Sequence, residues 1–529
     1  MGGTKSKTGC QTCKSVIRRI RCGEEKPTCL RCSSTGRQCH YNPVSIYTRS
    51  IIESPLIQTA FPSSAGVRER RAFEFYFHEA GPSLSGELDL DFWRGSVLQI
   101  CRLEPLIWDA IISLGALYER PPIHETTPFS LINHPAAVES PLHHEALEWY
   151  SRSLAGLQKR INYGEADLTV SLISCVLFIA IELLQGNRKA ATTLYHQGSH
   201  LLGNALTVAG NMMDSRFYIN SGPLASILKP IFRRLGTWVL INSDLSAGSC
   251  PVDLISMEGR LESIDEARNM LYDIFAEMKA LNVDVEAFWR KTPETRPQEI
   301  PALETRTEHL RNRLHRWLHL FQLLQSIRNP HSHQATTTDS GTASLLLMTY
   351  KAISIEIETM LSPDQLAYDN HQDEFAQILQ LAPATVASTR NPNGKQPPFM
   401  FEMGVFLPLF ITALKCRFPE LRRQALRLLW EAPPAQGMFM CRPTAHVVTI
   451  LMALEENPTI VPGDLSQVKE MLASPGHMPT AADRIWEFRV SSNMDDAGKT
   501  QNWLHYTLQE TDAAGYTWAV EKLAHLPGM

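Results

Sequence analysis

The chain has 529 residues, with 50 Lys and Arg against 55 Asp and Glu, which gives a formal net charge of −5 at neutral pH. Hydrophobic residues make up 44% and charged residues 20% of the sequence, and these ordinary values exclude a chain that is disordered throughout. The longest uncharged apolar run, residues 168–181, is too short to span a bilayer, and the polar N-terminus carries no secretory signal. We therefore expect no membrane partner and a reducing compartment, where clustered cysteines indicate metal or redox chemistry.

The overall charge is the sum of two unlike regions. Residues 1–50 hold ten basic and two acidic side chains, a net +8, whereas the rest of the chain holds 40 basic and 53 acidic side chains, a net −13. Six of the 11 cysteines lie between Cys10 and Cys39. The sequence thus predicts a small, basic, cysteine-rich head followed by a large, acidic body. Attraction to a polyanion would come from the head.

The cysteines of the head have a spacing that suits metal ligation. They follow the pattern C-x2-C-x8-C-x6-C-x2-C-x6-C, and they are Cys10, Cys13, Cys22, Cys29, Cys32 and Cys39. Six thiolates fill the eight coordination positions of two tetrahedral zinc ions only if two sulfurs bridge, which leaves no position open for water or substrate. We therefore expect two structural Zn²⁺ ions, each supplying about 10 kcal/mol of folding free energy to a segment too small for its own core. A four-cysteine zinc ribbon with two bystanders and a redox dithiol are the alternatives.

Basic side chains gather between the second and third cysteines. They are Lys14, Arg18, Arg19 and Arg21. Ile17 and Ile20 would occupy the other side of a short helix through this stretch. Such a helix can enter the major groove of double-stranded DNA, where an Arg side chain matches the O6/N7 edge of guanine and other basic side chains contact phosphates.

Four strings in the head carry a family resemblance. They are TGCQTCK at 8–14, RRIRC at 18–22, KPTC at 26–29 and RC at 31–32. On these strings, residues 8–41 resemble the fungal Zn2Cys6 binuclear-cluster DNA-binding domain. The resemblance implies that Cys10 and Cys29 bridge the two ions. It gives the remaining ligands as Cys13 and Cys22 for one zinc and Cys32 and Cys39 for the other.

The same resemblance assigns roles outside the ligand set. Arg18 and Arg19 stand where the family reads a CGG-type triplet, and Pro27 is the loop proline between the two halves of the cluster. The chain departs from the family in having eight residues, not six, between the second and third cysteines, and omitting Ser15 and Val16 would restore a typical string. Two extra helical residues rotate the rest of the helix by about 200° and shift it by about 3 Å, so they either bulge out or distort the cluster.

After the head, residues 42–66 predict a proline-containing linker without coiled-coil heptads, so binding as a monomer and dimerisation through the body both stay open. Residues 67–529 predict a large all-α domain of the bundle or solenoid type, with a minor β hairpin near the C-terminus. The expected helices are 68–80, 92–101, 104–118, 140–161, 167–185, 189–206, 226–240, 263–281, 304–324, 342–361, 373–381, 408–416, 419–430, 444–455 and 465–473. The candidate strand segments are 485–490, 503–509 and 516–521.

The body also resembles a family, the helical fungal-specific transcription factor domain that follows such zinc heads. The strings that carry this are FYF (75–77), AGPSLSG (80–86), DFW (91–93), VLQ (97–99), EPLI (104–107), SLGALYE (113–119), SCVLF (174–178), LQGN (184–187), KCR (415–417) and RRQA (422–425). These strings are mainly core-packing segments. They therefore imply the fold and the type of protein in which it occurs more than they imply functional residues.

Signatures of common enzyme classes are missing from the sequence. It contains no G-x-G-x-x-G, P-loop, G-x-S-x-G or H-E-x-x-H motif, so we predict no catalytic residues. We expect the His-His-Glu cluster at 143–145 to be a solvated or capping group. We expect His331 and His333 to be exposed loop residues. The aromatic set at 73–77 and the lone cysteines of the body are expected in the core. Those cysteines are Cys101, Cys175 and Cys416.

Together these features predict a nuclear, sequence-specific DNA-binding regulator of genes transcribed by RNA polymerase II. The resemblance implies that it reads CGG-containing sites, acts with the transcription machinery and serves one metabolic pathway or gene cluster. One rival hypothesis is a helical interaction or scaffold protein whose zinc head is impaired by the insertion of Ser15 and Val16. Another is an enzyme that uses the head only for targeting, which the missing motifs disfavour.

Overall fold

The structure is a computed structural model, and it describes residues 28–35, 65–86, 88–122, 140–211, 223–242, 260–289, 296–328, 337–362, 364–461, 464–494, 500–511 and 517–526. Contacts divide the chain into two compact units, Met1–Ala65 and Gly66–Met529. In the first unit the described residues form one short helix, α2 (Leu30–Ser33). Most of the predicted head (1–41) and linker (42–66) lies outside the described residues, so their boundaries stay predictions.

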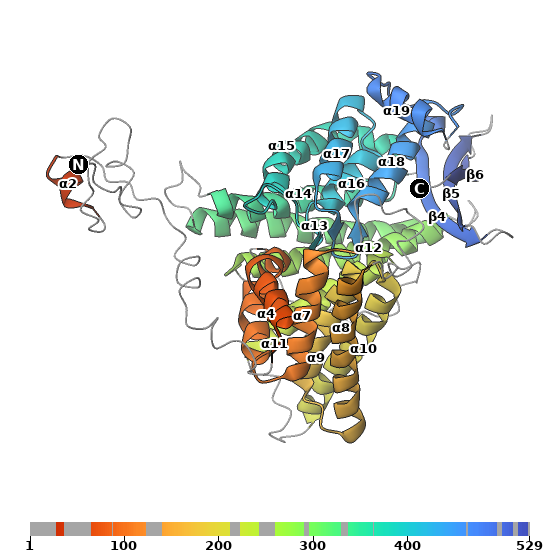
Figure 1. The fold of residues 1–529 in the computed structure, drawn as a ribbon. Helices are drawn as coiled ribbons and strands as arrows, with labels where there is room; N and C mark the ends of the chain where they lie inside the picture. Colours follow the sequence, from red (N-terminus) through yellow and green to blue (C-terminus); the bar gives the residue numbers. More distant parts are fainter. Residues whose placement is uncertain are drawn as a thin grey trace, which may run out of the picture. The chain divides into compact units, whose positions relative to one another are not determined.

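The Gly66–Met529 unit begins with a helical bundle in which α4, α7, α8, α9 and α10 lie side by side (Figure 1). The helices of this part, in chain order, are α4 (Val67–Phe75), a π-helical turn (Tyr76–Ala80), α5 (Gly81–Ser85), a second π-helical turn (Asp91–Ser96), α6 (Val97–Ile100), α7 (Pro105–Glu119), α8 (Pro141–Tyr163), α9 (Leu168–Leu184), α10 (Arg188–Asn211) and α11 (Pro223–Asn242). Mostly, each helix packs against the next one in the chain.

Helix α9 is the centre of this bundle, as its composition requires. Fourteen of its 17 residues are buried, since a helix that is apolar on every side must be covered on every side. The Asp167 carboxylate caps its first turn by accepting a hydrogen bond from the Val170 amide at 2.9 Å. The preceding helix ends at Gly164, whose φ of 70° closes α8 in the left-handed conformation that glycine adopts readily.

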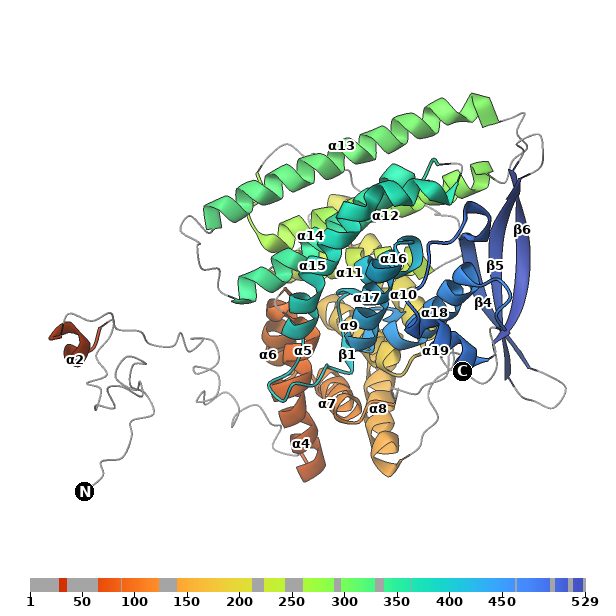
Figure 2. The same cartoon turned by 90° about the horizontal axis from the view of Figure 1, so that it is seen from above.

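The second half of this unit is also helical. Its helices are α12 (Ile264–Trp289), α13 (Arg296–Arg328), α14 (Thr337–Thr359), a 3₁₀ turn (Gln365–His371), α15 (Gln372–Ser388), α16 (Phe406–Lys415), α17 (Pro419–Glu431), α18 (Cys441–Glu456), α19 (Leu465–Ala473) and a final 3₁₀ turn (Ala481–Asp483). The long helices α12 and α13 lie next to each other, α14 packs on both of them, and α15 packs on α14 (Figure 2). Helix α11 connects the two halves by packing on both α10 and α12.

Two small sheets complete the fold. The first joins three two-residue strands, β1 (Phe399–Met400), β2 (Ala435–Gln436) and β3 (Phe439–Met440), with β1 parallel and β3 antiparallel to β2. The second is an antiparallel meander of β4 (Ile485–Met494), β5 (Thr500–Thr511) and β6 (Thr517–Leu526). Its apolar face, which includes Leu504 and Leu526, packs with Ile450 and Leu454 of α18 in one core cluster.

The described fold confirms a mostly helical body, and each predicted helix overlaps a helical segment of the structure. The three candidate strand segments overlap β4, β5 and β6, and the minor hairpin expected here is in fact a larger, three-stranded meander whose apolar side chains share a core cluster with α18. The predicted end of α15 at residue 381 is also too early, since the helix continues through Pro383 to Ser388. Among the helices in the described ranges, none is both long and apolar enough to cross a membrane.

Candidate DNA-binding head and a groove in the helical body

The described part of the head contains one pair of the predicted zinc ligands. Cys29 is the N-cap of α2, and its carbonyl accepts hydrogen bonds from the amides of Cys32 at 2.9 Å and Ser33 at 3.0 Å. This single turn places the two cysteines three positions apart on one helical face. Both cysteines are fully buried, whereas Leu30 between them is 65% exposed. A buried C-x-x-C pair on one turn fits two ligands of a common zinc ion.

The other predicted residues of the head lie outside the described residues. These are the ligands Cys10, Cys13, Cys22 and Cys39, the DNA-binding residues Lys14, Arg18, Arg19 and Arg21, and the loop residue Pro27. Within the described ranges, no group of three or more His, Cys, Asp or Glu residues is arranged to hold a metal ion. The zinc cluster and its DNA-reading face therefore stay predictions.

The lone cysteines of the body are core residues, as predicted. Cys101, Cys175 and Cys416 are buried, and burial raises the pKa of their thiols to about 12, 12 and 11. A thiol with so high a pKa stays protonated at neutral pH and is a poor nucleophile or metal ligand. Their environment is that of packed apolar residues.

The other candidates from the sequence behave as structural groups where the structure describes them. The His143 amide donates to the Ser140 hydroxyl that caps α8, and His144 lies 3.3 Å from Glu148 on the exposed surface. Phe73 and Tyr76 of the aromatic set are buried. His331 and His333 lie outside the described residues.

A buried cluster of charged residues joins the two halves of the body. Asp89 accepts hydrogen bonds from Arg234 of α11 at 2.8 Å and from Arg268 of α12 at 2.9 Å. Arg268 also reaches Glu402 at 3.1 Å, and Glu402 accepts a hydrogen bond from Tyr272. Burial acts to raise the pKa of Asp89, but the two guanidinium groups hold it below its ordinary value, so the carboxylate is charged. Each carboxylate oxygen of Asp89 has a partner, which is the pattern of a structural ion cluster.

A second buried cluster surrounds Glu455 of α18. Its carboxylate contacts Arg417 at 2.8 Å and Arg422 at 2.5 Å, and all three side chains are at most 1% exposed. The Glu455 carboxylate also accepts a hydrogen bond from the Ile485 amide at 2.7 Å, which attaches the first residue of β4 to α18. Burial opposes ionisation of Glu455, but the two arginines lower its pKa. This cluster fixes the sheet to the helices.

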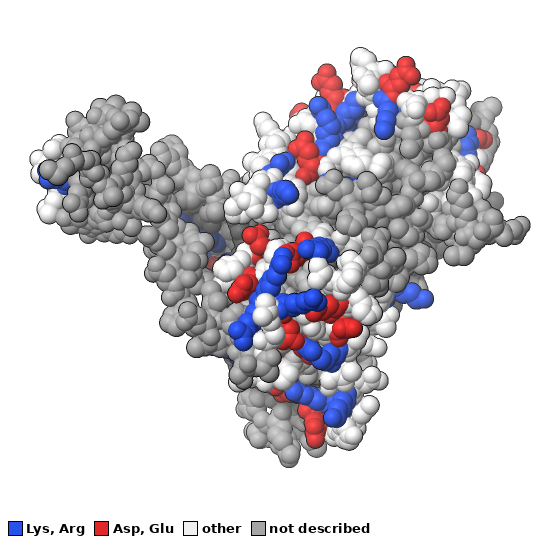
Figure 3. Space-filling model, viewed as in Figure 1, with Lys and Arg blue, Asp and Glu red and all other residues white. Residues whose placement is uncertain are grey.

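The surface of the body carries charges of both signs. On the face shown in Figure 3, the described basic and acidic side chains are interspersed over the helical bundle. Ion pairs between helices of the bundle include Arg68–Glu145 at 3.1 Å and Arg71–Glu119 at 2.6 Å. That face of the bundle therefore does not offer a continuous basic strip for the phosphate backbone of DNA.

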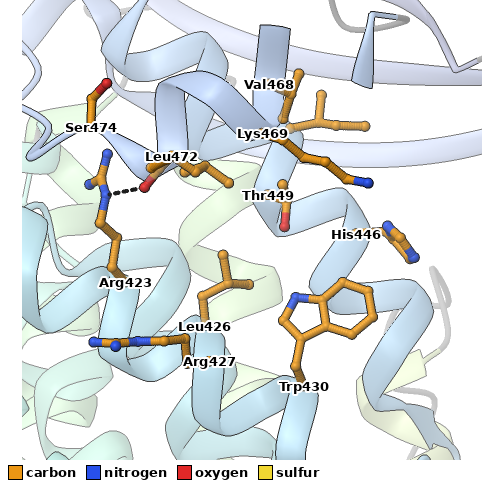
Figure 4. A pocket seen from close by; sticks show the side chains of 12 residues that line it. Arg423, Leu426, Arg427, Trp430, His446, Thr449, Val468, Lys469, Leu472 and Ser474 are labelled. Carbon is orange, nitrogen blue, oxygen red and sulfur yellow. Dashed lines mark hydrogen bonds between the residues drawn. The ribbon is translucent and has the colours of Figure 1, made fainter. Parts of the chain in front are cut away.

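A groove with a volume of about 550 Å³ lies between α17, α18 and α19 (Figure 4). Arg423 of α17 fixes its geometry, since its two terminal nitrogens donate to Glu456 of α18 at 2.9 and 2.6 Å and its Nε donates to the Leu472 carbonyl of α19 at 3.2 Å. No motif in the sequence marks these residues as a site. The available signal was the recurrence of Arg423, Arg427 and Trp430 on one helical face, which combines cations with an aromatic ring.

Comparison with curated proteins finds transcription regulators of fungi. The aspercryptin biosynthesis cluster-specific transcription regulator atnN of Emericella nidulans is 28% identical over 230 residues, 37% of this chain and 34% of that protein. The transcription regulator lscL of Purpureocillium lilacinum is 28% identical over 189 residues, 33% of this chain and 44% of that protein. An uncharacterized transcriptional regulatory protein of Schizosaccharomyces pombe is 24% identical over 268 residues, 47% of this chain and 46% of that protein.

The matched segments thus span less than half the length of each of these three relatives. No family model matches the chain. No solved structure matches it either. What the relatives do share is a name as transcription regulators, and for one of them the name specifies a biosynthesis cluster.

Proposed function

We propose that this protein is a sequence-specific DNA-binding regulator of transcription by RNA polymerase II. The six-cysteine pattern with its interleaved basic residues carries the proposal, because two zinc ions held by thiolates leave no catalytic position and the basic side chains suit DNA. The buried turn of Cys29 and Cys32 and the names of the relatives support it. In this proposal the protein acts in the nucleus, contacts the transcription machinery and serves one biosynthetic pathway.

The zinc ions would act by folding the head. Bound to the six cysteines, they would supply the free energy that a segment of this size cannot obtain from a hydrophobic core. Cys10 and Cys29 would bridge the ions. Arg18 and Arg19 would then read guanines of a CGG-type triplet, and Lys14 and Arg21 would contact the backbone. The body would supply regulation, and dimerisation if it occurs.

A second candidate function comes from one observation, the eight-residue spacing between Cys13 and Cys22. If Ser15 and Val16 distort the cluster, the chain is a helical interaction protein that does not select DNA. Zinc content and DNA selection, measured on the same full-length sample, separate the two candidates. Two zinc ions per chain and enrichment of CGG-containing sites from random DNA support the regulator. Fewer zinc ions, or two without DNA selection, support the interaction protein.

A further inference from the structure

The groove between α17, α18 and α19 combines an apolar floor with a positively charged rim. Leu426, Ile450 and Val468 form buried parts of its wall, with Val468 only 1% exposed. Trp430 is half-buried, and its indole meets the His446 ring edge-on with 4.5 Å between centroids. An indole held in this way offers a flat apolar surface to a bound molecule.

The ionisable side chains that line the groove are all basic. None of the twelve residues that line it is acidic, and Lys469, Arg427 and His446 are exposed. Arg423 is already paired with Glu456, but Arg427 has no acidic partner among the described residues. Figure 4 shows the Lys469 side chain extending toward His446 above Trp430, with Arg427 beyond Leu426. Partial burial and the nearby charge of Lys469 both lower the pKa of His446.

We propose that this groove binds a small organic carboxylate, with the anionic group at Lys469 and an aromatic or branched aliphatic body on Trp430 and Leu426. The volume of about 550 Å³ falls within the roughly 300–1,000 Å³ of small-molecule sites. The uncompensated cations select an anion over a neutral or cationic molecule of the same shape. The proposal does not depend on whether the head binds DNA.

The architecture also explains how binding at this site would reach the rest of the body. Arg423 connects the groove to Glu456, and the adjacent Glu455 carries the buried contacts to Arg417, Arg422 and the first strand of the meander. A ligand that holds α19 against α17 and α18 therefore stabilises the same helices that support the sheet. We expect the bound state to unfold at a higher temperature than the free state.

The test uses the full-length protein and 1-naphthaleneacetate as probe, with 1-naphthaleneacetamide as the neutral molecule of nearly the same shape. Isothermal titration should show binding of the acetate and at least about tenfold weaker binding of the amide, because a charge-assisted hydrogen bond is lost. Lys469→Gln should weaken the acetate about tenfold and leave the amide unchanged. Lys522→Gln, at an exposed lysine of β6 outside the groove, is the matched control and should change neither affinity.

Results of three kinds would overturn the proposal. One is the absence of acetate binding at millimolar concentration to protein that is folded by circular dichroism. Another is equal binding of acetate and amide, or equal acetate binding by wild type and Lys469→Gln, since either result removes the role of charge. The third is binding of a short amphipathic peptide of Glu and Leu without any binding of the acetate, which would make the groove a protein-docking surface.

Discussion

Asp89 and Arg268 are 179 positions apart in the chain, and they form a buried ion pair in which Arg268 Nη2 lies 2.9 Å from Asp89 Oδ1. Arg234 approaches the same carboxylate with one nitrogen 2.8 Å from each oxygen. Asp89 is therefore shared by two guanidinium groups that are at most 3% exposed, and Arg268 also pairs with Asp265 and Glu402. The segment before the second π-helical turn is attached in this way to both α11 and α12.

Loss of this carboxylate should strongly destabilise the body. We predict that Asp89→Asn lowers the free energy of unfolding by about 3–5 kcal/mol, because it takes from buried Arg234 the carboxylate with which it pairs and from buried Arg268 one of its three carboxylate partners. Chemical denaturation followed by circular dichroism measures this. The control is Glu521→Gln, which breaks a pair with Arg489 whose side chains are 55% and 67% exposed, and it should cost much less stability because solvent screens the pair. Equal losses in the two variants would contradict a structural role of the buried cluster.

Asp273 should give the body a distinctive dependence on pH. Burial raises the pKa of Asp273 to about 6 from 3.8, although Arg233 and Arg313 act in the opposite direction. A raised carboxyl pKa means that the folded state binds the proton more tightly than the unfolded state. The stabilisation is therefore complete below a pH of about 3.8 and is lost as the pH rises through about 6.

The measurement is the difference in free energy of unfolding between wild type and Asp273→Asn. As the pH falls from about 6 to about 4, this difference should shift in favour of wild type by up to about 3 kcal/mol. Other titrating groups affect both proteins and cancel. A difference that stays constant across this range would show that Asp273 ionises normally in the folded protein.

The helices could be predicted from the sequence because their information is local. Asp167 before an apolar run and Gly164 after an amphipathic one fix the limits of α8 and α9 within a few residues of the chain. The two-residue strand β1 could not be predicted, because its pairing with β2 joins Phe399 to Ala435 and no periodic pattern exists in so short a segment. The cluster around Asp89 could not be predicted either, because its partners Arg234 and Arg268 are 145 and 179 positions away and no sequence pattern links them.

The head and the groove also differ in how far apart their residues lie in the sequence. The six cysteines and Arg18 and Arg19 could be proposed as a site since all of them occur within 30 consecutive residues, Cys10 to Cys39. The groove needs three helices, and only the positions of Arg423, Arg427 and Trp430 along α17 gave a local signal. What makes it a site is the position of Lys469 on α19, which only the tertiary fold determines.

Arg18 and Arg19 should determine base preference. We predict that Arg18→Ala or Arg19→Ala costs about 1–3 kcal/mol of DNA-binding free energy and relaxes the preference at one base of the triplet. Arg49→Ala, at a basic residue in the predicted linker, is the matched control and should weaken binding similarly for all sequences, if at all. Selection from random DNA followed by titration measures both effects. Unchanged base preference in both triplet variants would exclude this role.

The bridging cysteines should be needed for both metal ions. We predict that Cys10→Ser or Cys29→Ser reduces the zinc content of the full-length protein from two ions per chain toward none, because each change removes a ligand of both ions. Cys101→Ser, at a buried cysteine of the body, should keep both ions. Metal analysis after dialysis gives the ratio. Full zinc content in either bridging variant would refute the assignment of Cys10 and Cys29 as bridges.

Deletion of Ser15 and Val16 distinguishes a tolerated bulge from a damaged cluster. If the two residues bulge out of the helix, the helix after them keeps its register, and the deletion variant should hold two zinc ions and select the same triplet as wild type. If they remain helical, Arg18 and Arg19 are turned by about 200° in wild type, and DNA selection should appear only after the deletion. The proposed function predicts the first result, measured by zinc analysis and random-DNA selection on both proteins side by side. Selection by the deletion variant alone would establish that the natural chain has lost DNA reading and acts through its helical body.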